Sequence, residues 1–294
     1  NIEASMNKYL REKVFTEYKD AMIYVERTDS VGNVRAGIVG KIDLEQYDYS
    51  KKSTSFIRAT EATVAERIPA RVEIRNNAVV ELPHVMLLVD DAGMHVIEPC
   101  EQEKEHLPLL YDFDLMMGGG HLCGWLLGKE EKKRIEKALT FLADPKCFAD
   151  KYHVKNRPVL LFAVGDGNHS LATAKECYEH QKAKSGSGIK ARYALVELEN
   201  LQDESQQFEP IHRLVKQVST EQMLKEIKEI ICVTKSRHKI EYYAENEYGT
   251  LYLDERLGEL PVGILQNFLD DYAERHSCTM DYIHDDEVLK ALSQ

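Results

Sequence analysis

Residues 158–174 read PVLLFAVGDGNHSLATA, and the rest of the chain is organised around this stretch. Residues 158–164 form an apolar run of strand length, and residues 170–180 have helix-forming composition. Between the two lie residues 165–169, GDGNH, which contain two glycines. The stretch therefore predicts a buried strand, a tight glycine-rich turn and a helix that starts directly after the turn.

A turn of this kind offers a site for an anion. Asn168 or Ser170 can cap the following helix, and the free N–H groups and positive dipole end of a helix N-terminus suit a phosphate or a carboxylate. Asp166 and His169 place an acid and an imidazole beside it. The alternative is a tight turn in which Asp166 and Asn168 serve only as local caps.

Composition limits the classes of protein to consider. The chain has 294 residues, of which 43% are hydrophobic and 30% charged, as in a globular protein of one or two domains. With 50 acidic and 38 basic side chains the formal net charge is −12, so nucleic acid is not expected as a partner.

The cysteines and the apolar runs bear on the compartment. Six cysteines lie far apart without a C-x-x-C pair, which favours reduced thiols over disulfides or a zinc site. No apolar run approaches 18 residues and no signal segment is visible, so we expect a cytoplasmic protein that does not bind membranes. The chain starts at Asn1 without Met, and we expect a fragment or a trimmed start.

Hydrophobic periodicity predicts an α+β fold in two parts, with a larger domain at residues 1–215 and a smaller α+β module at 216–294. The expected elements of the first part are, in order, a helix at 2–20, a hairpin of 21–27 with 34–41, a helix from about residue 60, a strand at 82–90 with a hairpin partner at 94–97, helices at 130–143 and 147–152, the strand and helix described above, and a strand at 191–198. The module has helices at 221–231 and 262–276 around a hairpin, then a strand and a helix within 280–292.

Three further segments carry candidate site residues. Residues 58–71 contain Arg58, Glu61 and Arg67, a density of forked donors around a carboxylate that suits phosphoryl transfer. The alternative is a solvated helix with surface ion pairs, which is the commoner explanation for such a segment taken alone. The glycines at 118–120 with His121 indicate either a close approach of the backbone to a ligand or a hinge. The pair His212 and Arg213 suits an anion contact or a helix start.

The common nucleotide and hydrolase motifs are absent from the sequence. No G-K-[ST] follows the glycines, and there is no G-x-G-x-x-G, G-x-S-x-G or H-E-x-x-H. The segments at 58–71 (RATEATVAERIPAR), 81–91, 112–121 (DFDLMMGGGH), 165–175 (GDGNHSLATAK) and 208–213 instead closely resemble a large bacterial family long filed as a domain of unknown function. Members of that family usually carry an additional N-terminal segment.

The GDGNH segment is also similar to the D-G-H-H-R phosphate loop of ParB-type partition proteins, the sulfiredoxin-like fold and free-serine kinases. That resemblance implies a ParB/sulfiredoxin-like mixed-sheet core and an enzyme that phosphorylates free L-serine to O-phosphoserine from pyrophosphate or a nucleotide. In those kinases a glutamate from an earlier loop lies in an H-E context, and Thr60 and Glu61 stand at the matching position here. Three positions depart from the kinase residues: Thr60 stands where the His of that context is expected, Asn168 replaces the first His of the loop, and Ser170 replaces its Arg. Losing that Arg removes a bidentate phosphate contact.

The resemblance implies roles for individual residues. Glu61 is the expected base, Asp166 the ligand of Mg²⁺ or the residue that orients the loop, and His169 a catalytic contact of the transferring phosphate. The other expected contacts are Gly167, Asn168, Ser170, Arg58 and Arg67 for phosphate, and Gly119, Gly120, His121, His212 and Arg213 for the substrate. The alternatives are a ParB-like nucleotide-binding switch without kinase activity and a structural protein with an inactive site.

Overall fold

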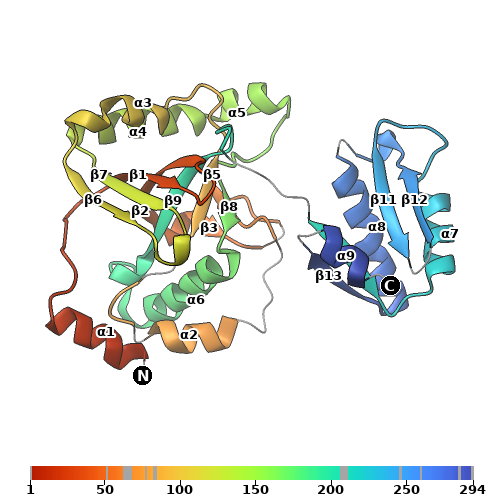
Figure 1. Ribbon diagram of the computed structural model, residues 1–294, viewed down its shortest axis with the longest axis horizontal. Coiled ribbons are helices and arrows are strands. Elements are labelled where there is room, and N and C mark those ends of the chain that lie inside the picture. Colours follow the sequence, from red (N-terminus) through yellow and green to blue (C-terminus); the bar gives the residue numbers. More distant parts are fainter. Residues whose placement is uncertain are drawn as a thin grey trace. The chain divides into compact units, whose positions relative to one another are not determined.

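A computed structural model describes the chain in two compact units, Asn1–Gln206 and Gln207–Gln294. The described residues are 2–50, 52–61, 68–76, 78–81, 85–205, 211–244, 247–258, 260–283 and 286–292. Both units combine helices and strands, so the predicted α+β class is confirmed (Figure 1). The division falls before the expected boundary at 215, because the strand β10 (His212–Lys216) pairs with a strand of the second unit.

The first unit is built on a mixed sheet of nine strands in the order β3-β4-β8-β5-β9-β2-β1-β7-β6. The strands β3, β4 and β8 run parallel to one another, whereas most other neighbours are antiparallel. The strands are β1 (Ile23–Thr28), β2 (Val34–Asp43), β3 (Tyr47–Asp48), β4 (Ile57–Arg58), β5 (Met86–Val89), β6 (Leu109–Asp114), β7 (His121–Leu126), β8 (Phe162–Asp166) and β9 (Tyr193–Asn200).

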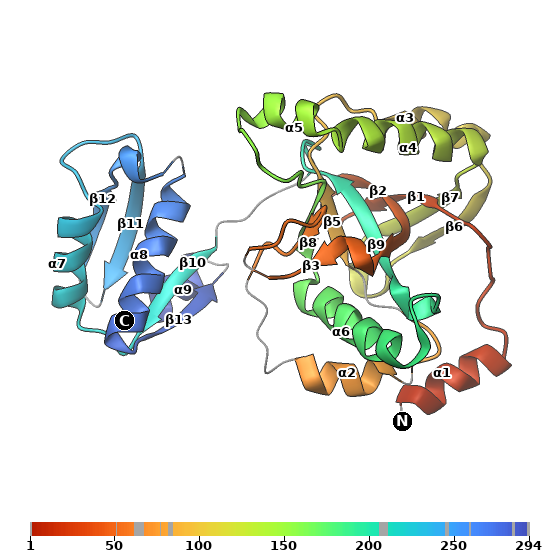
Figure 2. The ribbon, with the colours of Figure 1, turned by 180° about the vertical axis from the view of Figure 1, so that it is seen from behind.

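The helices of this unit lie in two groups. In Figures 1 and 2, α3 and α4 run side by side at the top of the unit and α2 and α6 lie at its bottom. Side chains of α4 and α6, such as Ile135 and Leu171, enter the same apolar cluster as the sheet residues Tyr24, Leu87 and Val164. The helices are α1 (Ile2–Arg11), α2 (Ile68–Asn76), α3 (Glu98–Glu103), α4 (Lys129–Leu142), α5 (Pro145–Tyr152) and α6 (Asn168–Ser185).

Several elements differ from the sequence-based expectation. The helix α1 ends at Arg11, well before residue 20. Residues 94–97 are not a strand, because the buried Asp91 carboxylate accepts hydrogen bonds from the N–H groups of His95 and Val96 and so folds them into a turn. The glycines at 118–120 lie in the turn of the β6–β7 hairpin and are therefore not a hinge between two halves.

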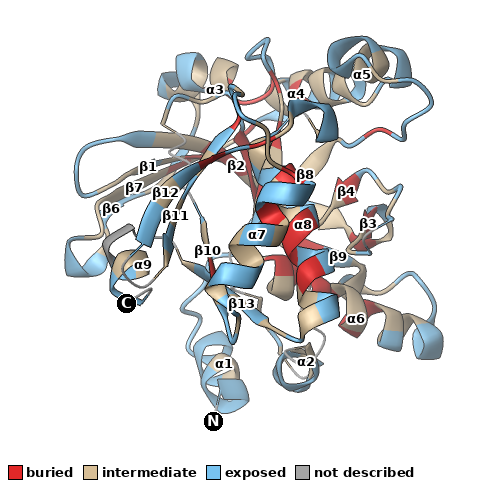
Figure 3. Ribbon diagram, turned by 90° about the vertical axis from the view of Figure 1, so that its right-hand side faces the viewer, coloured by how far each residue is buried: buried red, intermediate tan, exposed pale blue. Residues whose placement is uncertain are grey.

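The second unit follows the order β10, α7, β11, β12, α8, β13, α9. The strand β10 pairs with β13 (Thr279–Ile283), and β11 (Lys239–Ala244) pairs with β12 (Glu247–Tyr252). The helices are α7 (Thr220–Ile230), α8 (Pro261–His276) and α9 (Asp286–Leu292). The buried face of α8 carries Ile264, Phe268, Leu269 and Tyr272 and forms the centre of this unit's own apolar cluster (Figure 3). None of the helices described in either unit is long and apolar enough to cross a membrane.

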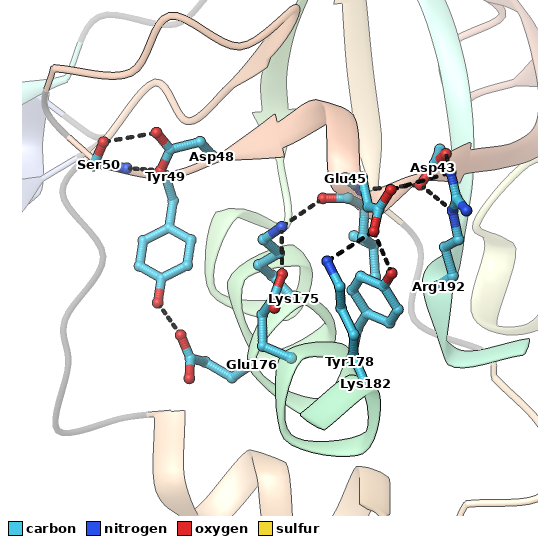
Figure 4. A network of polar contacts seen from close by, with 12 residues as sticks. Asp43, Glu45, Asp48, Tyr49, Ser50, Lys175, Glu176, Tyr178, Lys182 and Arg192 are labelled. Carbon is cyan, nitrogen blue, oxygen red and sulfur yellow. Dashed lines mark hydrogen bonds and ion pairs between the residues drawn. The ribbon is translucent and has the colours of Figure 1, made fainter. Parts of the chain in front are cut away.

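Polar contacts clamp α6 to the chain between β2 and β3 (Figure 4). Glu45 accepts hydrogen bonds from Tyr178 and Lys182 of α6 at 2.7 and 2.8 Å. Next to it, the Arg192 guanidinium donates two hydrogen bonds to the Asp43 carboxylate, at 2.9 and 2.5 Å. These contacts fix the direction of α6 and with it the position of its N-terminus.

We expect the Arg192→Gln variant to melt at a lower temperature than the wild type at pH 7, because it loses both hydrogen bonds to the Asp43 carboxylate. The hydrogen bonds from Arg192 hold the pKa of Asp43 below its usual range. The stabilisation is therefore complete above the unfolded pKa of about 4 and is lost as the pH falls through the lower folded value. Thermal unfolding at pH 7 and pH 3 should show a difference from the wild type that shrinks in acid.

The exposed pair of Lys8 with Glu12 provides the control for that measurement, since its ends are 3.8 Å apart and more than half exposed. Lys8→Gln should change the unfolding free energy by less than about 0.5 kcal/mol at either pH. An Arg192→Gln effect that stays the same size at pH 3 would contradict the assigned role of the Asp43 charge.

Candidate functional site

The candidate site lies where the parallel strands β4 and β8 end. Ile57 and Arg58 of β4 stand opposite Phe162 and Ala163 of β8. Because the carboxyl ends of neighbouring parallel strands meet at one edge, residues 60–61 after β4 come close to the GDGNH segment, which joins the end of β8 to the start of α6. This sheet edge is the usual place for a ligand site in open sheets with parallel strands.

The turn itself depends on its glycines. Gly167 has φ +87°, a left-handed backbone that glycine adopts at little cost, and it is the N-cap of α6 without a capping side chain. A Cβ at Gly165 would stand 3.0 Å from Cγ of Leu88. The exposed Asp166 carboxylate accepts a hydrogen bond from the Gly167 N–H at 2.6 Å. An 18-residue helix thus begins at this turn. Because its N-cap residue is a glycine, no N-cap side chain accepts hydrogen bonds from the N–H groups at the positive end of the helix dipole.

Two hydrogen bonds join Thr60 to Asn168, the first residue of α6. The Thr60 N–H donates to Oδ1 of Asn168 at 3.2 Å, and Nδ2 of Asn168 donates to Oγ1 of Thr60 at 3.2 Å. Thr60 Oγ1 in turn donates to the Val164 carbonyl group at 2.6 Å. Asn168 is only 4% exposed, so its amide is committed to this link and does not face solvent. The link fixes the loop after β4 against the start of α6.

Glu61 follows Thr60 and is therefore held beside His169. The Glu61 carboxylate (Oε1) lies 3.8 Å from Nδ1 of His169. The Glu61 side chain is 60% exposed and that of His169 only 16%. A carboxylate open to solvent thus stands next to a largely buried imidazole in the first turn of α6, with Ser170 following in the same turn. The predicted residues Glu61, Asp166, Gly167, Asn168, His169 and Ser170 all belong to this one place.

The predicted arginines differ in their placement. Arg58 donates through its Nη2 to the carbonyl groups of Pro158 and Val159, at 3.2 and 2.8 Å, which holds the segment before β8. No described residue of the turn accepts a hydrogen bond from it, and burial lowers the pKa of its guanidinium. Arg67 lies outside the described residues.

The remaining predicted residues belong to other parts of the structure. Gly119 and Gly120 lie in the turn between β6 and β7, and His121 starts β7. In the sheet order, β7 is five strand steps from β8. His212 and Arg213 lie on β10 of the second unit, where Nε of Arg213 donates to Gln266 at 3.0 Å and its guanidinium stacks over the Tyr282 ring.

Thr60 is the site residue that the sequence did not single out for a role. A signal for it was present in the sequence, because Thr60 and Asn168 are two of the three positions named above as departures from the free-serine kinase residues. The structure pairs these two departures with each other. Because 108 residues separate Thr60 from Asn168 in the chain, the sequence alone could not show that they form a hydrogen-bonded pair.

We expect Asn168→Ala to lower the unfolding free energy by about 1–2 kcal/mol, since the buried Asn168 side chain makes two hydrogen bonds to the exposed Thr60 and both are lost. Thermal or urea unfolding measures this loss. Asn7→Ala, which removes one exposed bond to the Glu3 carbonyl group, is the matched control and should cost much less. Equal losses of unfolding free energy in the two variants would show that the Thr60–Asn168 link stabilises the fold no more than an exposed hydrogen bond does.

The fold and the site define a mixed α+β protein with a glycine-rich turn and a helix N-terminus at the ends of parallel strands. The chain belongs to the family described as "Protein of unknown function (DUF1015)", whose model matches residues 1–272. Searches of curated proteins and of solved structures found no match.

Proposed function

We propose that this protein is a small-molecule kinase that transfers a phosphoryl group from pyrophosphate or a nucleotide to the hydroxyl group of free L-serine. One observation carries the proposal: the Thr60–Asn168 link holds the exposed Glu61 carboxylate beside His169, at the start of a helix whose N-cap is a glycine. A base and an anion site then lie next to each other, as phosphoryl transfer requires.

The proposal includes a ParB/sulfiredoxin-like core for the first unit. The parallel pair of β4 and β8 with the GDGNH turn before α6 supports this assignment. The free-serine kinases have a His where this chain has Thr60, and a His where it has Asn168. The mutual hydrogen bonds of Thr60 and Asn168 support the view that the loop keeps its geometry despite both changes.

In the proposed reaction, the serine oxygen attacks phosphorus while the bond from phosphorus to the leaving phosphate oxygen breaks. Glu61 orients the serine hydroxyl group and takes its proton. The first-turn N–H groups of α6, from Asn168 to Ser170, face the transferring phosphoryl group and stabilise its charge. His169, which lies in the first turn of α6 with its side chain only 16% exposed, offers a further polar contact beside Glu61.

Asp166 fits the role of a Mg²⁺ ligand. Its side chain is exposed, and its Oδ1 accepts the hydrogen bond from the Gly167 N–H, so Oδ2 can face a cation. Magnesium commonly binds through one carboxylate, substrate phosphates and water, and it would supply neutralisation of phosphate charge.

Phosphorus NMR tests the proposal directly. The protein is incubated with Mg²⁺ and L-serine and with pyrophosphate, ADP or ATP in separate samples, each repeated without serine. We expect a new phosphomonoester signal from at least one donor, only when serine is present and not with Glu61→Ala. If no donor gives a product but a donor still raises the melting temperature, the kinase assignment is wrong, and the nucleotide-binding module without transfer becomes the better interpretation.

A further inference from the structure

The paired strands β6 and β7 carry a second group of chemically reactive side chains, outside the proposed phosphoryl-transfer site. Asp112 stands directly opposite Cys123, and Asp114 stands directly opposite His121. Opposite residues of an antiparallel pair share a face, and so do residues two apart on one strand. All four side chains therefore project from the same face of the hairpin.

Their ligand atoms are close enough to share one ion. A carboxylate oxygen of Asp112, a ring nitrogen of His121 and Sγ of Cys123 lie within 4.8 Å of one another. Nε2 of His121 is 2.7 Å from Oδ1 of Asp112. Asp112 is exposed, and His121 and Cys123 are partly buried, so an ion from solvent can reach the cluster without opening the sheet.

The orientation of the imidazole is a second, independent feature. Nδ1 of His121 is 2.7 Å from Oδ1 of Asp114. A histidine that binds a metal usually donates its other ring N–H to a carboxylate, which fixes the ring and makes the binding nitrogen more basic. Asp114 occupies that position here and turns Nε2 toward Asp112 and Cys123.

The turn of the hairpin holds His121 in place. The Leu115 N–H donates to the Gly120 carbonyl group at 2.8 Å, which closes the turn just before His121. Thr28, the last residue of β1, stands opposite His121 on its other side. The other nearby acid, Glu26, is opposite Cys123 but is already bound by Lys104 at 2.6 Å and by the Tyr24 hydroxyl group at 2.8 Å. The ligand set is therefore Asp112, His121 and Cys123.

We propose that Asp112, His121 and Cys123 bind a divalent transition metal of the Zn²⁺ class, with Asp114 as the positioning residue for His121. A set of one oxygen, one nitrogen and one sulfur ligand suits Zn²⁺ and its neighbours, whereas Mg²⁺ and Ca²⁺ prefer oxygen alone. Three protein ligands leave one tetrahedral position for water or an exchangeable ligand. The site differs in metal class and position from the proposed Mg²⁺ ligand Asp166, which lies on β8, five strand steps away.

Titration of the full chain with Co²⁺, without serine or phosphate donors, tests the site by a readout independent of activity. We expect one Co²⁺ per chain, a thiolate-to-metal charge-transfer absorption, and displacement of that signal by Zn²⁺. Cys123→Ser should abolish the absorption, whereas Cys147→Ser, at a partly buried cysteine on α5, should keep it. Asp114→Asn should keep the absorption and weaken the affinity about 10- to 100-fold.

The outcomes decide between specific and non-specific binding. Absence of the charge-transfer absorption in the wild type, or its persistence in Cys123→Ser, would overturn the proposal. An Asp114→Asn variant that binds as tightly as the wild type would overturn the positioning role. Far-ultraviolet circular dichroism of each variant shows that the fold is retained, so that a lost signal reports on the ligands.

Discussion

Glu61→Gln is expected to lower kcat for the proposed serine phosphorylation by about 10²- to 10⁴-fold, with little change in KM. Glutamine keeps the size and polarity of the side chain but cannot take a proton from the serine hydroxyl group. The side chain is 60% exposed and its carboxylate lies 3.8 Å from His169, so the substitution should leave the fold intact. Steady-state rates of O-phosphoserine formation, with the donor identified by NMR, provide the measurement.

Glu105→Gln is the matched control. Glu105 is an exposed glutamate in the short 3₁₀ helix Lys104–His106, and its side chain makes no hydrogen bond or ion pair with the residues that the structure describes. It should keep the wild-type rate and melting temperature. If Glu61→Gln retains more than about a tenth of the wild-type kcat while folding normally, Glu61 is not the base, because a general base contributes at least about 100-fold. If that variant still forms O-phosphoserine, the result contradicts only the role of Glu61 and not the proposed kinase reaction.

The parts of the fold that depend on short-range pattern were predictable. The hairpin of β1 and β2 follows from two apolar runs around Asp29, whose carboxylate accepts hydrogen bonds from the N–H groups of Val31 and Asn33 in the turn. The unit of β8, turn and α6 follows from the apolar run and the glycines of residues 158–174. In both cases residues that are neighbours in sequence supply the determining contacts.

The predictions that were wrong or missing concern features that depend on contacts between distant segments. The hairpin of β6 and β7 was missed because its turn contains three glycines, which also suit a ligand approach or a hinge. Residues 94–97 have strand-like composition, but the buried Asp91 carboxylate captures their N–H groups. For the site, the sequence could name Glu61 and His169 through a resemblance, but not the Thr60–Asn168 link that brings them together.

Gly120→Ala is expected to lower the unfolding free energy by about 2–4 kcal/mol, which for a unit of this size lowers the melting temperature by about 5–15 °C. Gly120 has φ +97°, and a Cβ there would stand 1.9 Å from the Thr28 carbonyl oxygen. Since that oxygen belongs to the backbone at the end of β1, no side-chain rotation can relieve the clash, and the hairpin turn or β1 must move.

Gly118→Ala in the same turn is the control that distinguishes the effect of the steric clash from the effect of a positive φ. Gly118 also has a positive φ, +68°, but a Cβ there would meet nothing within 4 Å. This variant should lose only the cost of a left-handed alanine, about 1 kcal/mol, and melt about 2–4 °C below the wild type. Because Gly120 adjoins His121, Gly120→Ala should weaken Co²⁺ binding more than Gly118→Ala does. If the two variants have the same melting temperature, β1 and the turn do not pack as closely as the 1.9 Å distance from a Gly120 Cβ to the Thr28 carbonyl oxygen requires.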